Sequence, residues 1–290
     1  MRTQAKQPGA EAPGHAVTPG ALLWTHLCVR YEGCVLEYRR SLTACGRRLS
    51  RPAVHRLRVA IRRLLTCIEL LRAAGRKFPS VRRDLKRQMG ALGALRDTQV
   101  QLKAIRSEPQ YVDAMRPLVR RLRRLRRSEA KAARKALRGA AALRLLKQFN
   151  PGPAPGSARE TMRLREFIEG GLQRTARSLS SLAHAGPARR HRARKRLRRF
   201  YFVMEALKPV WHGDRDGRLS SSVHECQGAI GQIRDREILL RQVGRLVSEG
   251  KIPKASAGGF CARLKSEKAA QLRASRLLVL RARDASLARR

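Results

Sequence analysis

The sequence predicts an all-α protein made of two antiparallel four-helix units. The first reason is an internal repeat, because the stretch from His55 to Leu71, HRLRVAIRRLLTCIELL, returns as HRARKRLRRFYFVMEAL from His191 to Leu207. The second reason is the spacing of prolines and glycines, which divide the chain into long segments of helical periodicity. Nothing in the chain resembles the alternation of apolar and polar residues that is typical of strands.

A second landmark supports the repeat. The segment Leu92-Gly93-Ala94-Leu95-Arg96-Asp97 is echoed by Ile230-Gly231-Gln232-Ile233-Arg234-Asp235. It follows the histidine at nearly the same distance in each half, since the aspartate is 42 residues after His55 and 44 residues after His191. Two ordered motifs at matched spacing indicate a tandem duplication of one helical unit.

Both copies of the 17-residue motif form an amphipathic helix at 3.6 residues per turn. The predicted apolar arc of the first copy consists of Val54, Leu57, Ala60, Ile61, Leu64, Leu65, Ile68 and Leu71, and that of the second of Ala193, Leu197, Phe200, Tyr201, Met204 and Leu207. The opposite face carries His55, Arg58, Arg62, Thr66 and Glu69 in the first copy and His191, Arg194, Arg198 and Glu205 in the second. Arginines on neighbouring turns repel one another, so an anion is expected along this face.

The first half is predicted to span residues 21–149, after a disordered tail at residues 1–20 that is rich in Pro, Gly and Ala. Its first helix covers about 21–45, and the motif helix begins near Pro52 and ends near Gly75. A third helix begins at Ser80 and contains the second landmark. A fourth runs from Tyr111 to Phe149 and carries the densest run of cations, beside a predicted packing seam of Leu118, Leu122, Leu125, Ala132 and Ala136.

The second half is predicted to span residues 158–290, after a linker at 150–157 with the sequence NPGPAPGS. Its helices are expected at about 158–183, from the break at Gly186 to Trp211, at about 218–249, and from about 260 toward the C terminus. Gly93 and Gly231 lie inside helical segments, where glycine costs about 1 kcal/mol relative to alanine. Their recurrence predicts a close helix crossing at each.

The charge of the chain limits its partners. It contains 66 Lys and Arg against 21 Asp and Glu, which gives a formal net charge of +45. Such a molecule repels itself unless a polyanion or counter-ions neutralise it, so a polyanionic partner is expected. Arginine dominates among the cations, and its planar fork suits bidentate contacts to phosphate. A GC-rich coding sequence accounts equally well for the preference for Arg, although not for the excess of positive charge.

The cysteines and the hydropathy pattern favour a soluble cytoplasmic protein. The six cysteines show no CxxC pair and no clustered ligand spacing, so reduced thiols packed in helices are expected and no metal site is predicted. The first twenty residues lack the apolar core of a secretory signal. No segment of about 18 apolar residues is present, so no membrane span is predicted.

These motifs resemble the CHAD domain, the conserved histidine α-helical domain. The resemblance rests on His55-x-x-Arg58 with Arg62-Arg63, on His191-x-x-Arg194 with Arg198-Arg199, and on the Leu-Gly-x-Leu-Arg-Asp landmarks. It implies two four-helix bundles related by a pseudo-twofold axis, with a basic groove or pore between them that binds inorganic polyphosphate. The residues implied to line it are His55, Arg58, Arg62, Arg63, His191, Arg194, Arg198 and Arg199. The triphosphate-hydrolysing CYTH domain that accompanies some members is absent from this sequence.

Several residue roles remain open at the level of sequence. Each motif histidine could donate to phosphate or make a structural hydrogen bond. The glutamates Glu69 and Glu205 are expected to orient an arginine rather than to catalyse. Arg96 and Arg234 could contact the ligand, or could form salt bridges that fix the helices. The cations at residues 116–138 could form a solvated helix face or take part in binding.

The sequence favours a binding module over an enzyme. It contains no carboxylate cluster suited to Mg²⁺ and no Walker-type phosphate loop, and no cofactor is predicted. The hypothesis is a cytoplasmic protein, associated with polyphosphate granules, that binds polyphosphate. The alternative is sequence-independent binding of RNA or DNA through the backbone, since aromatic residues are only 4% of the chain and base stacking is not expected. A scaffold that recruits proteins to granules is compatible with the first hypothesis. No oligomeric state follows from the sequence.

Overall fold

The computed structural model describes residues 19–77, 81–138, 146, 157–180, 186–210 and 218–287, and in these residues it contains helices and no strand. The predicted all-α class is therefore confirmed. The first half of the chain forms α1 (Pro19–Arg47), α2 (Arg51–Ala73), α3 (Val81–Arg106), the single turn α4 (Pro109–Val112) and α5 (Arg116–Leu137). The second half forms α7 (Ala158–Ser180), α8 (Pro187–Leu207), α9 (Arg218–Ser248) and α10 (Lys254–Leu287).

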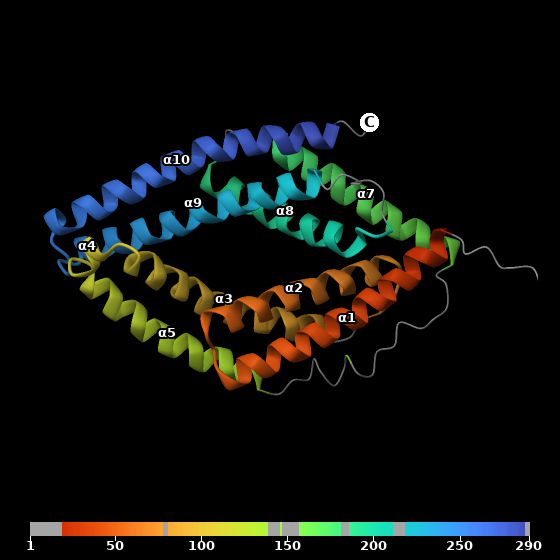
Figure 1. The fold of residues 1–290 in the computed structure, drawn as a ribbon, viewed down its shortest axis with the longest axis horizontal. Helices are drawn as coiled ribbons and strands as arrows, with labels where there is room; N and C mark the ends of the chain where they lie inside the picture. The colour runs from red at the N-terminus through yellow and green to blue at the C-terminus, as the bar shows by residue number, and fades with distance from the viewer. Residues whose placement is uncertain are drawn as a thin grey trace, which may run out of the picture.

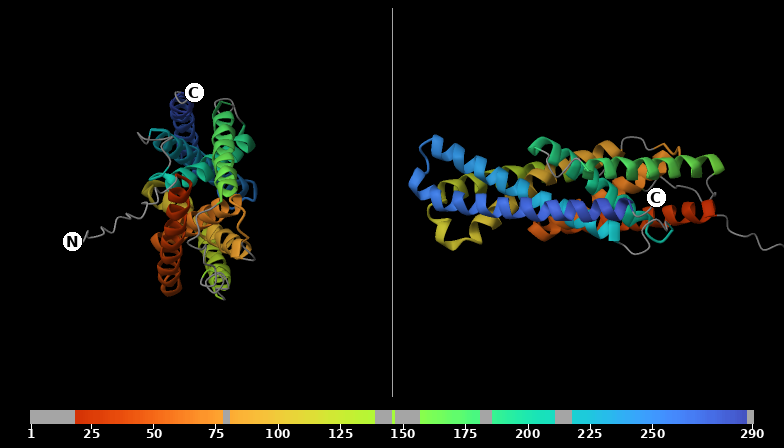
Figure 2. Two further views of the ribbon diagram at one scale, coloured as in Figure 1. Left: turned by 90° about the vertical axis from the view of Figure 1, so that its right-hand side faces the viewer. Right: turned by 90° about the horizontal axis from the view of Figure 1, so that it is seen from above.

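The two halves lie one above the other in an elongated molecule (Figures 1 and 2). Helices α1, α2, α3 and α5 form the lower layer in Figure 1, and α7 to α10 form the upper layer. The motif helices α2 and α8 lie on the inner side of their layers and contact each other across the boundary. The duplicated motif is therefore at the centre of the molecule.

Three apolar clusters hold the helices together, and two of them cross between the halves. The first joins α1, α2 and α3 to α7 and α8. The second joins the C-terminal part of α3 and the start of α5 to α9 and α10, at the left end of Figure 1. The third lies within α7 to α10. Each half therefore completes part of the core of the other.

The motif helices are buried more widely than a surface helix would be. Seven of the eight residues predicted for the apolar arc of α2 are buried and Leu65 is half-buried, while Thr66 on the predicted polar face is also buried. In α8 the predicted residues are buried except Tyr201, which is half-buried, and the neighbouring residues Phe202, Val203 and Ala206 are buried as well. The second face of each helix is covered because it meets the other half of the chain.

The predicted fourth helix is corrected in two respects. It is interrupted at Asp113–Met115, and α5 begins at Arg116 because Pro117 lacks an N–H donor and fits only the first turn of a helix. α5 ends at Leu137, where Arg138 adopts an extended conformation. Its packing seam also turns away from the predicted one, since Leu125 is 38% exposed and Ala133 is fully buried.

Most other boundaries agree with the expectations to within a few residues. The last helix is an exception, because α10 begins at Lys254 rather than near residue 260 and contains Gly258 and Gly259, which were expected to lie in a break. Each glycine costs a helix only about 1 kcal/mol, so these two do not end it. Ser50 caps α2 by accepting a hydrogen bond from the backbone N–H of Ala53, and Pro52 occupies the first turn as predicted. The tail at 1–18 and most of the segment 139–156, which includes nearly all of the predicted linker, lie outside the described residues. The six cysteines are free thiols, four of them buried.

Candidate functional site

The two motif helices bring four arginines together at the centre of the molecule. Arg58 and Arg62 come from α2, and Arg194 and Arg198 come from the same positions of α8. The arginines of the two helices act on one another, because Arg198 and Arg194 both affect Arg62, and Arg194 also acts on Arg58. In Figure 1 α2 and α8 run in the same direction, so the first arginine of each motif lies toward the same end of the molecule. We call these four residues the central arginine cluster.

The central arginine cluster is half-buried and carries uncompensated charge. Burial lowers the pKa of all four guanidinium groups, and repulsion among them lowers it further. The pKa falls to about 9 for Arg62 and to about 10 for Arg198. Within the described part of the chain none of the four forms an ion pair, and buried guanidinium nitrogens of Arg58 and Arg194 have no hydrogen-bond partner. Keeping four half-buried cations close together costs free energy, and a bound anion would reduce that cost.

Among the described residues, two carboxylates act on the pKa values of the cluster, and both belong to the second landmark. Asp97 of α3 attracts Arg58, and Asp235 of α9 attracts Arg194. Neither comes within ion-pair distance of a cation among the described residues. The pKa of the Asp235 carboxyl is raised, mainly by burial and partly by Asp97. Two such acids leave the four arginines with a net positive charge.

The landmark glycines make room for the arginines. A Cβ atom at Gly93 would lie 2.9 Å from Nη1 of Arg58, and one at Gly231 would lie 3.0 Å from Nη2 of Arg194. Both distances are too short for normal contact, so any side chain at these positions would displace a guanidinium group. We predicted that these glycines allow helices to cross closely, and the contact they allow is with an arginine side chain of the adjacent motif helix.

The two histidines flank the cluster, each beside the landmark arginine of its own half. Arg96 is the charged neighbour with the largest effect on His55, and Arg234 has that place at His191. The pKa of both imidazoles is lowered, first by burial and then by these and other arginines. In the described structure neither ring makes a hydrogen bond, and Nδ1 of His191 is buried without a partner. The structural hydrogen bond considered from the sequence is therefore not observed.

Arg96 and Arg234 lie beside the histidines without salt bridges. No ion pair joins either residue to Asp97, Asp235 or another described carboxylate. Nη1 of Arg96 is buried and has no partner, and burial together with Arg51 lowers the pKa of this guanidinium. The sequence left open whether Arg96 and Arg234 contact the ligand or form salt bridges that fix the helices. Among the described residues the salt bridges are not seen.

Arg63 and Arg199, which the resemblance places in the binding surface, are engaged in ion pairs between the halves. Nε of Arg63 on α2 donates to Glu205 on α8 at 3.0 Å, and Nε of Arg199 on α8 donates to Glu69 on α2 at 2.8 Å. Arg63 also pairs with Glu37 at 2.7 Å, and these carboxylates raise its pKa. The expectation that the motif glutamates orient arginines agrees with this reciprocal arrangement.

The sequence reasoning missed Arg51, which precedes His55 by one helical turn on the same face of α2. Arg51 acts on both His55 and Arg96, so it extends the basic surface beyond the motif. A step of four residues back from the histidine could have identified it. Among the described residues no group of three or more His, Cys, Asp or Glu side chains could hold a metal ion, and none of the described helices is long and apolar enough to cross a membrane.

Comparisons with known proteins place this arrangement in one family. The sequence model of the CHAD domain matches residues 36–285. Similar solved structures are the CHAD domain from the plant Ricinus communis, with 18% identity, coverage of 92% of both chains and a TM-score of 0.64, and PptA from Streptomyces chartreusis, with 17% identity, coverage of 90% of this chain and 98% of the other, and a TM-score of 0.67. A search of curated proteins gave no match. The chain belongs to the CHAD domain family.

Proposed function

We propose that this protein binds inorganic polyphosphate at the central arginine cluster without hydrolysing it. The observation that carries the proposal is the meeting of four half-buried guanidinium groups that have no ion-pair partner among the described residues. Polyphosphate supplies a negative charge on every unit, and each guanidinium group can donate two parallel hydrogen bonds to phosphate oxygens. The family relation to CHAD domains supports a polyphosphate-related role.

The histidines and landmark arginines add donors around the cluster. A phosphate close to His55 or His191 favours the protonated imidazole, which donates from both ring nitrogens. Arg96 and Arg234 extend the row of donors on each side. Arg63 and Arg199 act in this proposal by holding α2 against α8, so that the four arginines keep their spacing.

The proposal also covers the place and the chemistry of binding in the cell. We place the protein in the cytoplasm, on polyphosphate granules. Binding to a granule requires only a basic surface that follows a flexible chain of phosphates. The groups that face the anion are guanidinium and imidazole, which neutralise phosphate but do not assemble the carboxylate site for Mg²⁺ that phosphoanhydride hydrolysis normally uses. Chain length should stay constant when polyphosphate is incubated with the protein and Mg²⁺.

The first test compares two variants that lose the same formal charge. The cluster variant carries Arg58→Gln, Arg62→Gln, Arg194→Gln and Arg198→Gln. The control variant carries Arg241→Gln, Lys265→Gln, Arg273→Gln and Arg276→Gln, which replace exposed cations of α9 and α10 that form no ion pair among the described residues. Glutamine keeps the helix propensity and most of the side-chain stem.

The cluster variant should lose at least tenfold in affinity for long-chain polyphosphate at near-physiological salt, and the control variant should lose much less. The unfolding temperature of the cluster variant without ligand should not fall, because its substitutions remove repulsion among the four arginines. Equal losses in the two variants would contradict a defined site and would favour a general polyanion binder. In competition, long-chain polyphosphate should displace RNA at low concentration, and the opposite order would favour nucleic acid as the ligand.

A further inference from the structure

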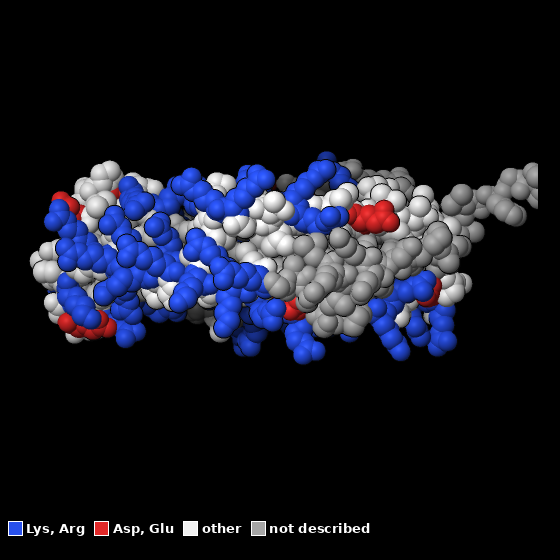
Figure 3. Space-filling view, turned by 90° about the horizontal axis from the view of Figure 1, so that it is seen from below, with Lys and Arg blue, Asp and Glu red and all other residues white. Residues whose placement is uncertain are grey.

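A second basic surface lies beside the central arginine cluster, in a hollow between α3, α5 and the turn that joins α1 to α2. The hollow has a volume of about 800 Å³, and its lining holds seven cations and no carboxylate. The cations are Arg48, Arg51, Lys103, Arg106, Arg126, Arg127 and Arg134. We call this hollow the α3–α5 groove. Figure 3 shows Lys and Arg side chains crowded over the end of the molecule that carries α5.

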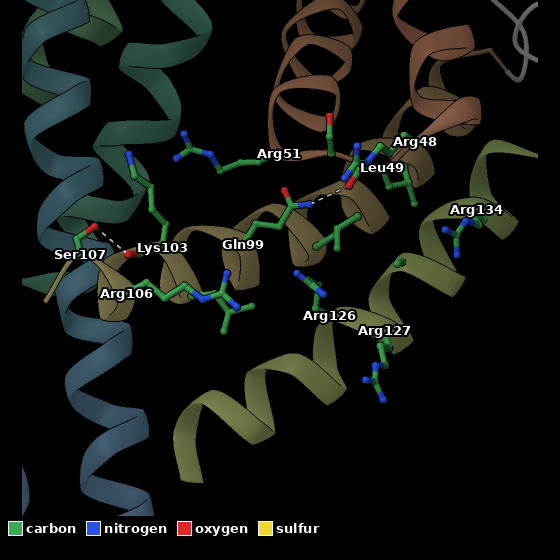
Figure 4. Close-up of a pocket in the computed structure, with 14 residues that line it drawn as sticks. Arg48, Leu49, Arg51, Gln99, Lys103, Arg106, Ser107, Arg126, Arg127 and Arg134 are labelled. Atoms are coloured by element: carbon green, nitrogen blue, oxygen red, sulfur yellow. Dashed lines mark hydrogen bonds between the residues drawn. The ribbon is translucent and has the colours of Figure 1, made fainter. Parts of the chain in front are cut away.

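The walls of the groove face each other across a fixed base. Figure 4 shows Arg106 of α3 and Arg126 of α5 on facing sides of the space between the two helices. At the base, Nε2 of Gln99 donates to the backbone carbonyl of Leu49 at 3.2 Å and holds the α1–α2 turn against α3. None of the seven cations forms an ion pair within the described part of the chain. The groove thus presents unneutralised charge on a rigid frame.

The groove continues from the central arginine cluster along two helices. On α2, Arg51 of the groove is followed by His55 and Arg58 at steps of four and three residues, which places all three on one face. On α3, Arg96 is followed by Gln99, Lys103 and Arg106 at steps of three, four and three, again on one face. Arg51 also acts electrostatically on His55 and Arg96, so the two stripes come together beside the cluster.

The described residues of α9 carry a different charge pattern at the positions equivalent to the groove positions of α3. The residue two positions after the landmark aspartate is Gln99 in the first half and Glu237 in the second. Glu237 forms an ion pair with Arg190 at 2.9 Å and lies 3.9 Å from Lys268. Nearby, Glu267 pairs with Arg236 at 2.8 Å and with Arg263 at 3.1 Å. Acids therefore pair with these cations of the second half, whereas the seven cations of the α3–α5 groove form no ion pair among the described residues.

We propose that the α3–α5 groove is an extension of the binding site, which takes the part of a polyphosphate chain that runs out of the central arginine cluster toward the first half. This inference rests on the proposed function and adds chain-length discrimination to it. A short oligophosphate reaches only the central arginine cluster, and a long chain also fills the groove. Only long chains therefore gain binding free energy from contacts in the groove.

The test uses a groove variant with Lys103→Gln, Arg106→Gln, Arg126→Gln and Arg127→Gln, beside the cluster and control variants defined above. All three lose four cations. The probes are tripolyphosphate and long-chain polyphosphate, measured by calorimetry at the same ionic strength with concentrations expressed per phosphate unit. Far-UV circular dichroism checks that each variant remains helical.

The groove variant should lose at least tenfold in affinity for long-chain polyphosphate and stay within about twofold of the wild type for tripolyphosphate. The control variant should show neither change. If the groove and control variants lose long-chain affinity equally, the groove is not an extension of the site, and the proposed function still stands. If the cluster variant keeps the wild-type affinity for both probes, the proposed function itself fails.

Discussion

At the scale of single residues, the site depends on two glycines that leave space for two guanidinium groups. Gly93 and Gly231 lie within the continuous helices α3 and α9, and they stand out in the sequence because they recur in the repeat. The contact that each glycine allows could not be predicted from the sequence, since the guanidinium nitrogen that lies beside it comes from another helix. Arg58 and Arg194 were predicted as ligands, and the structure shows that their positions depend on α3 and α9.

Replacing both glycines by alanine should weaken polyphosphate binding and leave folding intact. Each new methyl group must push a guanidinium group aside, and we expect a loss of affinity of about fivefold or more. Alanine favours a helix over glycine by about 1 kcal/mol, so the unfolding temperature should stay the same or rise. Isothermal calorimetry and thermal unfolding measure the two effects separately.

The chain offers a matched control for this experiment. Gly90 and Gly228 lie three residues before Gly93 and Gly231 on the same two helices, and a Cβ atom at either position would meet nothing within 4 Å. The Gly90→Ala, Gly228→Ala variant should gain the same helix propensity and bind polyphosphate as the wild type does. Wild-type affinity in the Gly93→Ala, Gly231→Ala variant would show that guanidinium placement is unimportant.

The histidines should make polyphosphate binding pH-dependent. In the free protein, burial and the neighbouring Arg and Lys side chains lower the pKa of His55 and His191 below the usual value of about 6.5. Bound phosphate favours the protonated rings, so binding takes up protons and affinity rises as the pH falls toward the pKa of the free protein. We expect an increase of about tenfold from pH 7.5 to 5.5 for long chains, with no change above the pKa of the bound state.

A His55→Gln, His191→Gln variant isolates this effect, because titration of the terminal phosphates of the ligand is the same for both proteins. The variant should show a flatter pH profile than the wild type. Parallel profiles would mean that the histidines stay in one protonation state on binding.

At the scale of helices, the contact between α2 and α8 is held by two reciprocal ion pairs of unequal exposure. In the Arg63–Glu205 pair the two side chains are 29% and 22% exposed, and in the Arg199–Glu69 pair they are 52% and 21% exposed. Charges that are better shielded from water interact more strongly. The two pairs therefore should not contribute equally to stability, although they occupy equivalent positions of the repeat.

Double-mutant cycles can test this inequality. With Arg63→Gln and Glu205→Gln we expect a coupling free energy of roughly 1 kcal/mol, measured by urea unfolding. With Arg199→Gln and Glu69→Gln the coupling should be smaller. Equal values, or a larger value for the Arg199 pair, would show that the exposed fractions do not govern these interactions.

The helix boundaries show which sequence signals were sufficient to predict the secondary structure. Helical periodicity with Pro and Gly breaks gave most helices to within a few residues, because these signals act within a single helix. Ser157 and Glu160 form a capping box at the start of α7, and the spacing of these two residues in the sequence is a signal for this helix start. The interruption before α5 was missed because the apolar spacing continues through Pro117, whose missing N–H ends the helix regardless of pattern.

At the scale of the whole molecule, the two halves share two of their three apolar clusters. The apolar cluster at the left end of Figure 1 combines residues of α3 and α5 with residues of α9 and α10. Tyr111 of α4 packs against it, with its ring centroid 5.6 Å from that of Phe260 in α10. The sequence reveals the duplication but not this apolar cluster shared by the two halves. The periodicity within a helix predicts its apolar face but does not say which other helix packs against that face. The pairing of Arg63 with Glu205 was unpredictable for the same reason.

A core substitution in the second half should therefore destabilise the first half equally. Leu197→Ala in the cluster confined to α7–α10 should cost roughly 2–5 kcal/mol. In a Trp211→Phe background, fluorescence reports on the buried Trp24 of α1, and far-UV circular dichroism reports on all helices. Both probes should shift to the same lower urea midpoint. An unchanged midpoint for Trp24 would show that the halves unfold independently.

The parallel course of α2 and α8 has a consequence for the direction of the ligand. Because α2 and α8 carry the same arginine spacing and run in the same direction, the cluster presents similar donors on both sides of the line between the two helices. A peptide or nucleic acid strand has chemically distinct ends, so its two directions along this line are not equivalent. Polyphosphate reads the same in both directions, so under the proposed function we expect a chain to enter the cluster by either end.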